Sequence, residues 1–380
     1  MLGADHRCVG PIEEFLEHHR VIGSSTNTVR AYAKGLQLWW EYLVAAGQGW
    51  EDPSVQTLGR FVTWLQTGLA PNVTELRRTE DDDRSPASST VEARLAAVIS
   101  FYRFHYDVHG CGAVLARAST GSSRRPYRSF LAHLDSRRRA PASPLRLRRS
   151  RRGPPPMLSP NQVAVILDAC AQLDAKTGTW SGSLRDRLLF ATLAETGMRL
   201  GEVLCLTHAD WHMGSGGTPS VEVTPRNDHP HGARVKGGQP RRIYISDDLE
   251  RLYGDYLWSL AEMAGEAGLA VTDDWFCFVN LAREPRFSPL RPESVYQVVA
   301  RLHRRLRGAV PVAWTPHWFR HTHATALLLA GVPLHVVSRR LGHADVQTTM
   351  NLYGWVTEDA EMRATAEWRR FAESWRTSSE

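Results

Sequence analysis

The stretch TPHWFRHTHAT, residues 315–325, shows most directly what kind of chain this is. Thr315 can cap a helix and Pro316 suits its first position, so the stretch predicts a helix that begins there. His317 and Arg320 then share one face of its first turn. Because free N–H groups and the helix dipole attract anions at this end, the pair suits a phosphate. In isolation, an ordinary surface histidine and arginine would give the same pattern.

Three more stretches concentrate unusual polar residues: ETGMRLGEVLCL (195–206), GARVKGGQPRRIYI (232–245) and LGHADVQTTMNLYGW (341–355). In the first, Arg199 follows a Thr-Gly turn and Glu202 lies three residues on. Such a carboxylate either orients the guanidinium toward a phosphate or forms an ordinary surface ion pair. In the second, Lys236 lies among glycines between two expected strands, where it can reach into a cleft or remain solvated.

The last stretch pairs a histidine with a tyrosine. His343 follows a Leu-Gly helix stop, and Tyr353 ends the next helix just before Gly354. A tyrosine at a helix end is commonly a core residue with a solvated hydroxyl. His317 lies four residues before His321, as in zinc-binding helices, but position 318 is a tryptophan and not the carboxylate of that motif. We therefore expect neither a metal nor another cofactor.

In this order, the four stretches resemble the signature of the tyrosine recombinase (phage integrase) family. Its pattern is an arginine in T-G-x-R-x-x-E, a lysine on a β-hairpin, H-x-x-R, and then L-G-H followed by a tyrosine. The resemblance covers about 159–355. The segments STNTVRAYAKGLQLWWEYL and STVEARLAAVISFYRFH are similar to the family's helical core-binding domain. GARVKGGQPRRIYIS looks like transposon-borne members. Trp318 and His323 depart from the family's usual residues but remove no catalytic atom.

The resemblance implies that Tyr353 attacks a scissile DNA phosphate, forming a 3′-phosphotyrosyl link and a free 5′ hydroxyl. Arg199 and Arg320 would clamp the non-bridging oxygens, and Glu202 would support Arg199. A free tyrosine has a pKa of about 10, so forming phenolate at pH 7 costs about 4 kcal/mol, which cationic groups around the phosphate can offset. Covalent catalysis conserves the phosphodiester energy, so no ATP is required.

The remaining roles that the resemblance implies concern proton transfer. His317 would assist as a proton acceptor, His343 would hydrogen-bond the phosphate, and Lys236 would protonate the leaving 5′ oxygen. The function expected is site-specific recombination, as integration, excision or transposition of a mobile element. Two alternatives remain: type IB topoisomerase-like or resolvase activity with the same chemistry, or a DNA-binding regulator with an inactive site.

Composition agrees with a DNA-acting protein. The 380 residues are 42% hydrophobic and carry a formal charge of +6, with a pI near 9.2, which favours a polyanionic partner. The five cysteines are odd in number and far apart, as in a reduced protein. The sequence shows neither a signal core nor an apolar run of bilayer length. We expect a soluble, cytoplasmic protein without a membrane partner.

We expect a mostly α fold with a small β-sheet, in two domains that form a C-shaped clamp. Residues 8–118 would be a helical core-binding domain, 119–156 an Arg/Pro-rich linker that is a tether or lies along DNA, and 157–378 the catalytic domain. A capping box at Ser159 starts a helix whose apolar stripe continues to Leu173. VEV and RRIYI predict strands. Further helices are expected over 184–193, 247–265, 292–307, 316–330, 333–341 and 345–353, followed by a last amphipathic helix.

Exposed basic residues are candidates for contact with double-stranded DNA. Ser24 to Asn27 offer caps for a helix that carries Arg30 and Lys34 opposite its apolar stripe. These two residues either contact phosphates or lie on a solvated face of the helix. The same holds for Arg301, Arg304 and Arg305. By the resemblance, a homo-tetramer would act on two DNA sites. The C-terminal helix would dock onto a neighbouring subunit or onto its own, through Trp368, Phe371 and Trp375.

Overall fold

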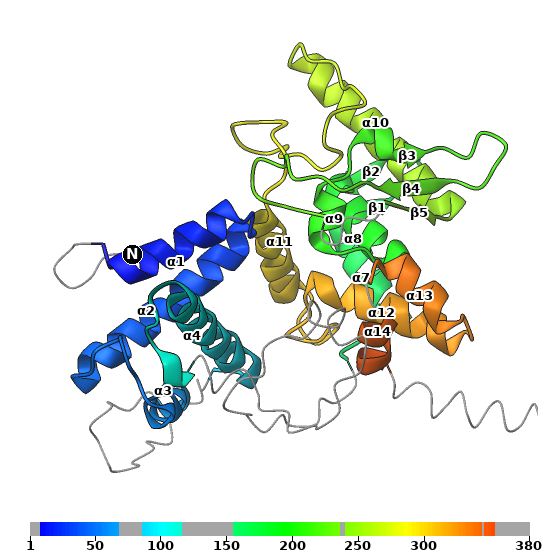
Figure 1. Ribbon diagram of the computed structural model, residues 1–380. Helices are drawn as coiled ribbons and strands as arrows, with labels where there is room; N and C mark the ends of the chain where they lie inside the picture. The colour runs from blue at the N-terminus through cyan, green and yellow to red at the C-terminus, as the bar shows by residue number, and fades with distance from the viewer. Residues whose placement is uncertain (1–7, 68–85, 116–154, 236–239, 344–345, 354–380) are drawn as a thin grey trace, which may run out of the picture. The chain divides into compact units, whose positions relative to one another are not determined.

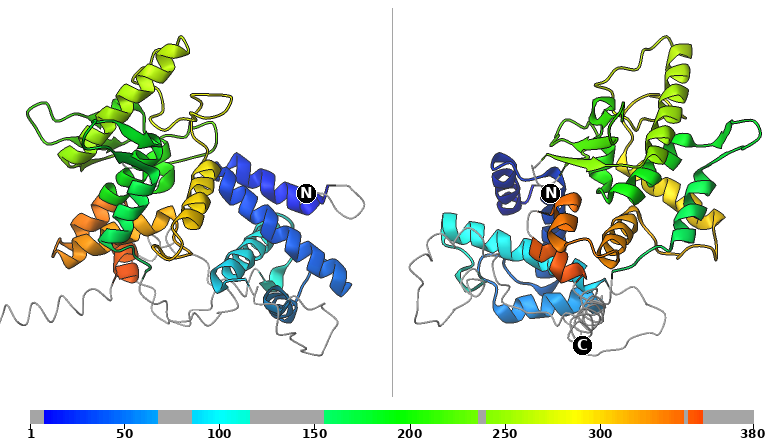
Figure 2. Two further views of the ribbon diagram at one scale, coloured as in Figure 1. Left: turned by 180° about the vertical axis from the view of Figure 1, so that it is seen from behind. Right: turned by 90° about the vertical axis from the view of Figure 1, so that its right-hand side faces the viewer.

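The computed structural model describes residues 8–67, 86–115, 155–235, 240–343 and 346–353. Internal contacts divide the chain into two compact units, 1–151 and 152–380. The described residues are mostly helical with small sheets, which confirms the expected fold class (Figures 1 and 2). No helix among them is both long and apolar enough to cross a membrane. Most of the Arg/Pro-rich segment, Lys236, and the C-terminal Trp368, Phe371 and Trp375 lie outside the described residues.

The first unit consists of helices around an aromatic core. Ser25 caps the second helix as predicted, because its hydroxyl accepts a hydrogen bond from the N–H of Thr28 at 3.1 Å. Leu36, Trp39 and Leu43 are buried on the expected face of that helix. The helices are α1 (Gly10–Val21), α2 (Thr26–Ala46), α3 (Val55–Thr67) and α4 (Ser88–His109).

One polar chain ties this core together. Nε1 of Trp39 donates to Oη of Tyr102 at 3.0 Å, and Oη of Tyr102 donates to the carbonyl of Trp50 at 2.8 Å. Both large rings are buried, so these bonds satisfy polar atoms that would otherwise be costly to bury. The three residues link α2, α4 and the loop before α3.

The second unit begins with the predicted capping box. Ser159 accepts from the N–H of Gln162, and the Gln162 side chain accepts from the N–H of Ser159. The helices that follow are α7 (Pro160–Cys170), α8 (Leu184–Thr196), α9 (Leu200–Leu204), the 3-10 turn η1 (His208–Asp210), α10 (Asp247–Glu266), α11 (Pro292–Arg305), α12 (Pro316–Leu329), α13 (Leu334–Leu341) and α14 (Val346–Tyr353). The helices expected between residues 184 and 353 are therefore present, each within two residues of its predicted limits except the first, which extends to Thr196. The last amphipathic helix that we expected lies outside the described residues.

The prediction that the stripe of α7 continues to Leu173 was wrong. The helix ends at Cys170, and β1 (Ala171–Leu173) pairs antiparallel with β2 (Trp180–Gly182). Leu173 is 51% exposed in that strand. A turn stabilised by the Asp174 carboxylate, which accepts from the N–H of Lys176 at 2.8 Å, reverses the chain between the strands.

A second sheet contains the strands predicted at VEV and RRIYI. Its order is β3 (Trp211–His212), β4 (Ser220–Val223) and β5 (Arg241–Tyr244), all antiparallel. In the β4–β5 register Val221 pairs with Ile243, and both are buried. Because strand side chains alternate, Arg241 points to the same side as Ile243, toward the protein interior.

Two apolar clusters position the helices that carry the candidate site. Phe190 of α8 lies 5.7 Å from Phe319 of α12 and 5.8 Å from Trp314, between ring centroids. A smaller cluster joins α12, α13 and α14 through Ala324, Val337, Leu341 and Tyr353. Packing against α12 thus brings α8 and α14 to the same helix.

Candidate active site

A glycine turn places Arg199. Gly197 follows α8 in the left-handed conformation, with φ 65°. A Cβ there would lie 2.7 Å from Cδ2 of His323 and 2.9 Å from Cδ2 of Leu341, so the position requires glycine. The chain then turns into α9 with Arg199 as its N-cap residue.

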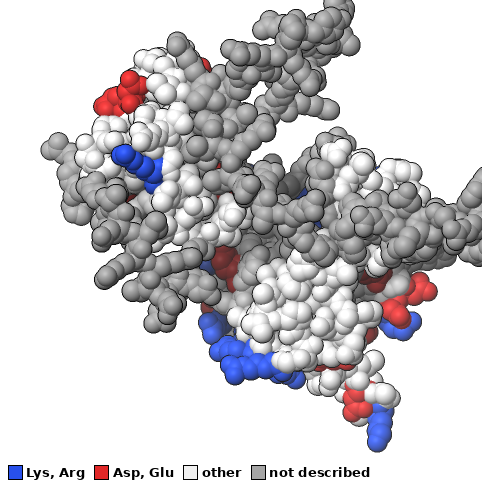
Figure 3. All heavy atoms as spheres, turned by 90° about the horizontal axis from the view of Figure 1, so that it is seen from below, with Lys and Arg blue, Asp and Glu red and all other residues white. Residues whose placement is uncertain are grey.

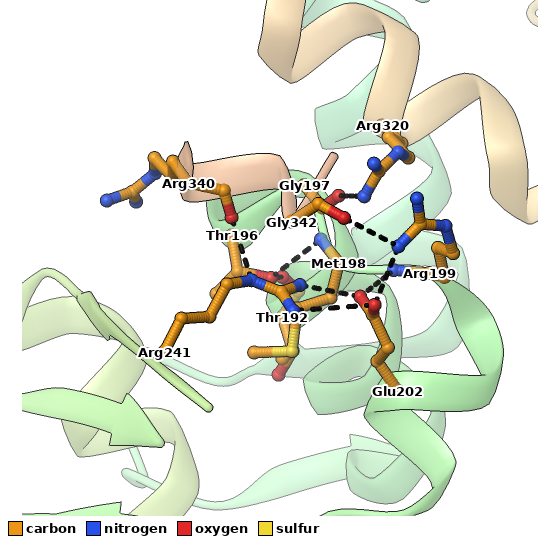
Figure 4. A network of polar contacts seen from close by, with 10 residues as sticks. All are labelled: Thr192, Thr196, Gly197, Met198, Arg199, Glu202, Arg241, Arg320, Arg340 and Gly342. Atoms are coloured by element: carbon orange, nitrogen blue, oxygen red, sulfur yellow. Dashed lines mark hydrogen bonds and ion pairs between the residues drawn. The ribbon is translucent and has the colours of Figure 1, made fainter. Parts of the chain in front are cut away.

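Glu202 is fully buried and joined to two arginines (Figure 4). Its carboxylate accepts from Nη1 and from the backbone N–H of Arg199, each at 2.8 Å, and from Nη2 of Arg241 at 2.7 Å. Burial pushes the pKa of Glu202 up, but the charge and hydrogen bond of Arg241, and then those of Arg199, outweigh it and lower the pKa. The carboxylate stays charged and fixes the direction of both guanidiniums.

Arg320 lies beside Arg199 and is 2% exposed (Figure 4). Its Nη1 donates to the carbonyl of Gly197 at 2.8 Å, while Nη2 is buried without a hydrogen-bond partner among the described residues. Burial, and then the charge of Arg199, lower the pKa of Arg320 to about 10. Arg320 is still a cation at neutral pH, and its open donor suits an anion.

The turn after α13 carries His343. Gly342 is left-handed, with φ 68°, and a Cβ there would lie 2.6 Å from Nη1 of Arg241. Nδ1 of His343 lies 2.6 Å from the buried hydroxyl of Thr349. Burial, followed by the charges of Arg320 and Arg199, lowers the pKa of His343 to about 4. His343 is therefore neutral at pH 7 and can hydrogen-bond a phosphate without adding charge.

The phenol of Tyr353 is buried, and its Oη lies 2.8 Å from Nδ1 of His321. Burial raises the pKa of Tyr353 to about 12, against the opposing charge of Arg320. The tyrosine is thus protonated in this structure. Its hydroxyl contacts the helix of Arg320, one residue beyond that arginine.

His317 lies one helical turn before His321 and is exposed. The two rings meet edge to face, with centroids 4.5 Å apart. Desolvation by the surrounding protein, then the charges of Arg320 and Arg199, lower the pKa of His317. Both arginines therefore act electrostatically on His317.

Most of the predicted site residues therefore meet in one place, while Lys236 lies outside the described residues. The residues that the structure brings together are Arg199, Glu202, His317, Arg320, His343 and Tyr353.

Sequence reasoning missed Arg241 and gave His321 no role at this site. A signal for Arg241 was present: it has the parity of Ile243 in β5, and the side chain of Arg241 is 9% exposed whereas that of Arg242 is 54% exposed. A charged residue on the buried side of a strand needs a carboxylate partner. For His321, no signal in the sequence connects it to Tyr353.

The expected DNA-contacting residues belong to two other helices, α2 and α11. Arg30 and Lys34 are exposed on α2, and Arg301 and Arg304 on α11. Arg305 is exposed too, but its Nη1 donates to the carbonyl of Ala169 at 2.8 Å. On the face in Figure 3, basic side chains of the described residues form separate groups, several beside acidic ones.

Arg301 also lines a pocket of about 420 Å³ between α11 and the loop before it. Three further arginines line this pocket, Arg185, Arg283 and Arg291, together with Asn280. Its lining favours an anionic ligand, although Arg185 is already engaged by Asp186 at 2.6 Å.

Among the described residues, one group of side chains is close enough to share a metal ion: Glu14, His105 and His109, whose ligand atoms lie within 4.8 Å of one another. It belongs to the first unit and not to the site around Arg320. Nε2 of His105 lies 3.0 Å from the carbonyl of Pro11, and Nε2 of His109 lies 2.8 Å from the Glu14 carboxylate. Protein atoms already partner these nitrogens.

Paired guanidiniums, neutral imidazoles and a buried phenol are the components of an enzyme that transfers phosphoryl groups through a tyrosine. The chain belongs to the phage integrase family: the family described as Phage integrase family matches residues 156–359, and the Phage integrase, N-terminal SAM-like domain matches residues 12–108. This confirms the resemblance and identifies a DNA recombinase that performs site-specific recombination.

Individual relatives agree. Transposase A from transposon Tn554 of Staphylococcus aureus is 29% identical over 93% of this chain and 89% of its own length. Tyrosine recombinase XerC of Rhodospirillum centenum is 26% identical, over 88% and 79%. The Tn1549 transposon integrase, solved in complex with transposon right end DNA, shares the fold with a TM-score of 0.58 at 17% identity, covering 94% of this chain and 99% of that one.

Proposed function

We propose that the chain recombines DNA through a covalent 3′-phosphotyrosyl link to Tyr353. The observation that carries this proposal is the convergence of α9, α12 and α14. Arg199 lies beside Arg320, and the Tyr353 hydroxyl contacts the residue that follows Arg320. These three functional groups come from stretches up to 154 positions apart, since 353 − 199 = 154. An ordinary protein surface rarely brings such groups together beside a buried carboxylate, here that of Glu202.

In the proposed reaction, Arg199 and Arg320 bind the non-bridging oxygens of the scissile phosphate. Tyr353 attacks phosphorus, and the 5′ oxygen leaves. With a pKa of about 12, ionising the phenol at pH 7 would cost on the order of 7 kcal/mol, which excludes a standing phenolate. This free energy of ionisation is offset only when a phosphate is bound to the two guanidiniums, because these then stabilise the negative charge that develops during the attack.

The other site residues complete this scheme. His343, which is neutral, and the exposed His317 hydrogen-bond the phosphate, and the family resemblance implies that His317 also assists as proton acceptor. Glu202 holds Arg199 in direction. Lys236 protonates the leaving 5′ oxygen, as the family resemblance implies. A second DNA end then attacks the phosphotyrosine and reverses the step, so neither a metal nor ATP is consumed.

The proposed partner is double-stranded DNA, held by residues 8–118 and 157–378 as a clamp joined by the linker 119–156. Exposed basic side chains would contact the DNA phosphates, so that the affinity for DNA would depend on salt. They are Arg30, Lys34, Arg301, Arg304 and Arg305. The active form would be a homo-tetramer on two sites, working in the cytoplasm. Relatives solved as DNA complexes support the DNA partner.

We propose transposition of a mobile element as the biological role. The Tn554 transposase matches nearly the full length of the chain, and the stretch GARVKGGQPRRIYIS resembles transposon-borne members of the family. Topoisomerase-like relaxation and resolution use the same chemistry. Supercoiled plasmids with and without paired target sites separate them: recombination requires the paired sites, whereas relaxation does not.

The test of the nucleophile is Tyr353→Phe. Duplexes are first selected from a random-sequence pool by their covalent, detergent-resistant capture on the wild-type protein. The variant is expected to bind these duplexes with unchanged affinity and to form no covalent adduct. An adduct with the variant would show that another residue attacks, and absence of any adduct with the wild type would support a DNA-binding regulator.

A further inference from the structure

The buried contact between Tyr353 and His321 is not explained by the roles above. The phenol is 2% exposed and His321 is 9% exposed, and their polar atoms are 2.8 Å apart. Sequence reasoning considered His321 only as a metal ligand. Yet, within the part of the chain that the structure describes, it is His321 that lies within hydrogen-bond distance of the Tyr353 hydroxyl.

The available hydrogen-bond partners indicate which atom donates in the bond between Tyr353 and His321. Among the described residues, Nδ1 of His321 is the partner that Oη of Tyr353 has. If Nδ1 carried the proton and donated, the phenol O–H would be buried without an acceptor, which costs more than an unused lone pair on oxygen. The favoured arrangement is therefore Oη–H donating to an unprotonated Nδ1, with the imidazole proton on Nε2.

We propose that His321 positions the phenol of Tyr353 through this hydrogen bond and accepts its proton as the oxygen attacks DNA. The inference rests on the proposed role of Tyr353 as nucleophile. In the step, the Oη–P bond forms and the P–O5′ bond breaks. The phenol proton passes to Nδ1, which makes His321 an imidazolium, and the 5′ oxygen receives a separate proton from the acid on the leaving-group side.

The surroundings explain why transfer would await DNA. The titratable or charged groups that act on His321 are His317 and Arg320 on its own helix and Tyr353 on α14. Burial, then the proximity of His317 and Arg320, lower the pKa of His321 to about 4, so the free enzyme keeps it neutral. A phosphate anion held by Arg320 would cancel part of that repulsion, and proton transfer becomes favourable only with the substrate in place.

This assignment moves the acceptor role from His317 to its neighbour. His317 is exposed and meets the His321 ring edge to face, and among the described residues no hydrogen bond joins it to Tyr353. His317 then remains a ligand of the phosphate. In this scheme His317 binds the DNA phosphate, and His321 accepts the proton of Tyr353.

The test uses single-turnover adduct formation on the selected duplexes, nicked so that the released fragment diffuses away. His321→Leu removes the acceptor and is expected to slow adduct formation at least ~100-fold, the lower range for general base catalysis. His321→Asn keeps an oxygen that can accept the hydrogen bond but not the proton, and is expected to recover at least ~10-fold of that loss. His317→Leu and His317→Asn are the matched controls, and these two variants are expected to slow adduct formation by similar factors.

Two results would overturn the inference. One is a His321→Leu rate within ~3-fold of wild type on duplexes where Tyr353→Phe forms no adduct. The other is a His321→Asn rate no faster than that of His321→Leu. If instead Tyr353→Phe still forms the adduct, it is the proposed nucleophile that fails.

A second measurement reports the tautomer of His321 directly and does not rely on reaction rates. Nitrogen-15 NMR of labelled histidines in the intact chain is expected to show His321 as the Nε2–H tautomer at pH 7. Its Nδ1 signal, assigned by its loss in His321→Asn, should shift in Tyr353→Phe. An Nδ1–H tautomer would contradict the donor assignment and with it the proton transfer.

Discussion

Arg241 and Glu202 form a buried ion pair of 2.7 Å between side chains that are 9% and 0% exposed. The pair connects β5 to α9 across 39 positions, and the same carboxylate holds Arg199. Arg241 also donates from Nε to the carbonyl of Arg340 at 3.0 Å, next to the turn of His343. The orientation of Arg199 and the turn of His343 thus both depend on Arg241.

Glu202→Gln is expected to destabilise the second unit strongly. The substitution leaves two arginines without their shared negative charge, and breaking a buried pair in this way costs about 3–5 kcal/mol. Urea unfolding at pH 7 measures the loss. The control is Asp248→Asn, which removes a pair with Arg251 whose side chains are 88% and 72% exposed and should change stability by less than ~0.5 kcal/mol. Equal effects of the two substitutions would contradict the structure.

Arg241→Gln is expected to slow adduct formation by about 10–100-fold, in keeping with the loss of 1.4–2.8 kcal/mol of positioning. Arg199 would lose the fixed orientation of its carboxylate partner, although no catalytic atom is removed. Arg242→Gln is the matched control on the same strand, because that side chain is 54% exposed and pairs with the partly exposed Glu222. Single-turnover rates compare the two. A normal rate for Arg241→Gln would show that Glu202 orients Arg199 unaided.

Much of this arrangement was accessible from the sequence because it is local. The caps at Ser25 and Ser159 lie within three residues of their partners, and so does Glu202 from Arg199. Local patterns thus predicted most helices. The residues that gather around Arg320 were identified by the order of the four motifs, which resembles that of the tyrosine recombinase family.

The features that we did not predict depend on contacts between residues far apart in the sequence. The residues after Cys170 read as more helix, and only the partner strand at 180–182 makes Leu173 a strand residue. The link of His321 to Tyr353 spans 32 positions and follows from the packing of α12 against α14. No periodicity reports such a contact, because it is fixed by how helices meet and not by either helix alone.

Protonation of His323 should lower the free energy of unfolding at acidic pH. Its Nδ1 donates to the carbonyl of Ala194 at 3.1 Å, and its Nε2 accepts from Nε of Arg340 at 3.0 Å. Burial, then the charge of Arg340, lower the pKa of His323 to about 4. Because the folded pKa lies below the unfolded value of about 6.5, this stability is complete above pH 6.5 and is lost as the pH falls toward 4.

Between pH 7.5 and 5.0, the loss from His323 should be about 1–2 kcal/mol in urea unfolding. His323→Asn keeps polar atoms but cannot titrate, so its unfolding free energy should change less over the same range. An identical slope for His323→Asn and wild type would exclude His323 as the source.

Gly342→Ala tests the close approach of Arg241 to the turn that carries His343. The new Cβ would meet Nη1 of Arg241 at 2.6 Å in addition to the strain of φ 68°. Gly331→Ala has a comparable φ of 83° with no atom within 4 Å, so it measures the strain alone, about 1 kcal/mol. Gly342→Ala should cost more than Gly331→Ala in unfolding free energy and also slow adduct formation. Equal costs would mean that Arg241 moves aside freely.

Lys236 can be tested by changing the leaving group instead of the protein alone. If its ammonium protonates the 5′ oxygen, Lys236→Met should slow adduct formation by about 10²–10⁴-fold on an ordinary duplex. A duplex with sulfur in place of the bridging 5′ oxygen releases a thiolate, which needs no proton, so the variant should approach the wild-type rate on it. Arg320→Ala is the control: it loses phosphate binding and should stay slow on both duplexes. If sulfur fails to restore Lys236→Met, the acid is another group, and the hairpin lysine acts on the phosphate instead.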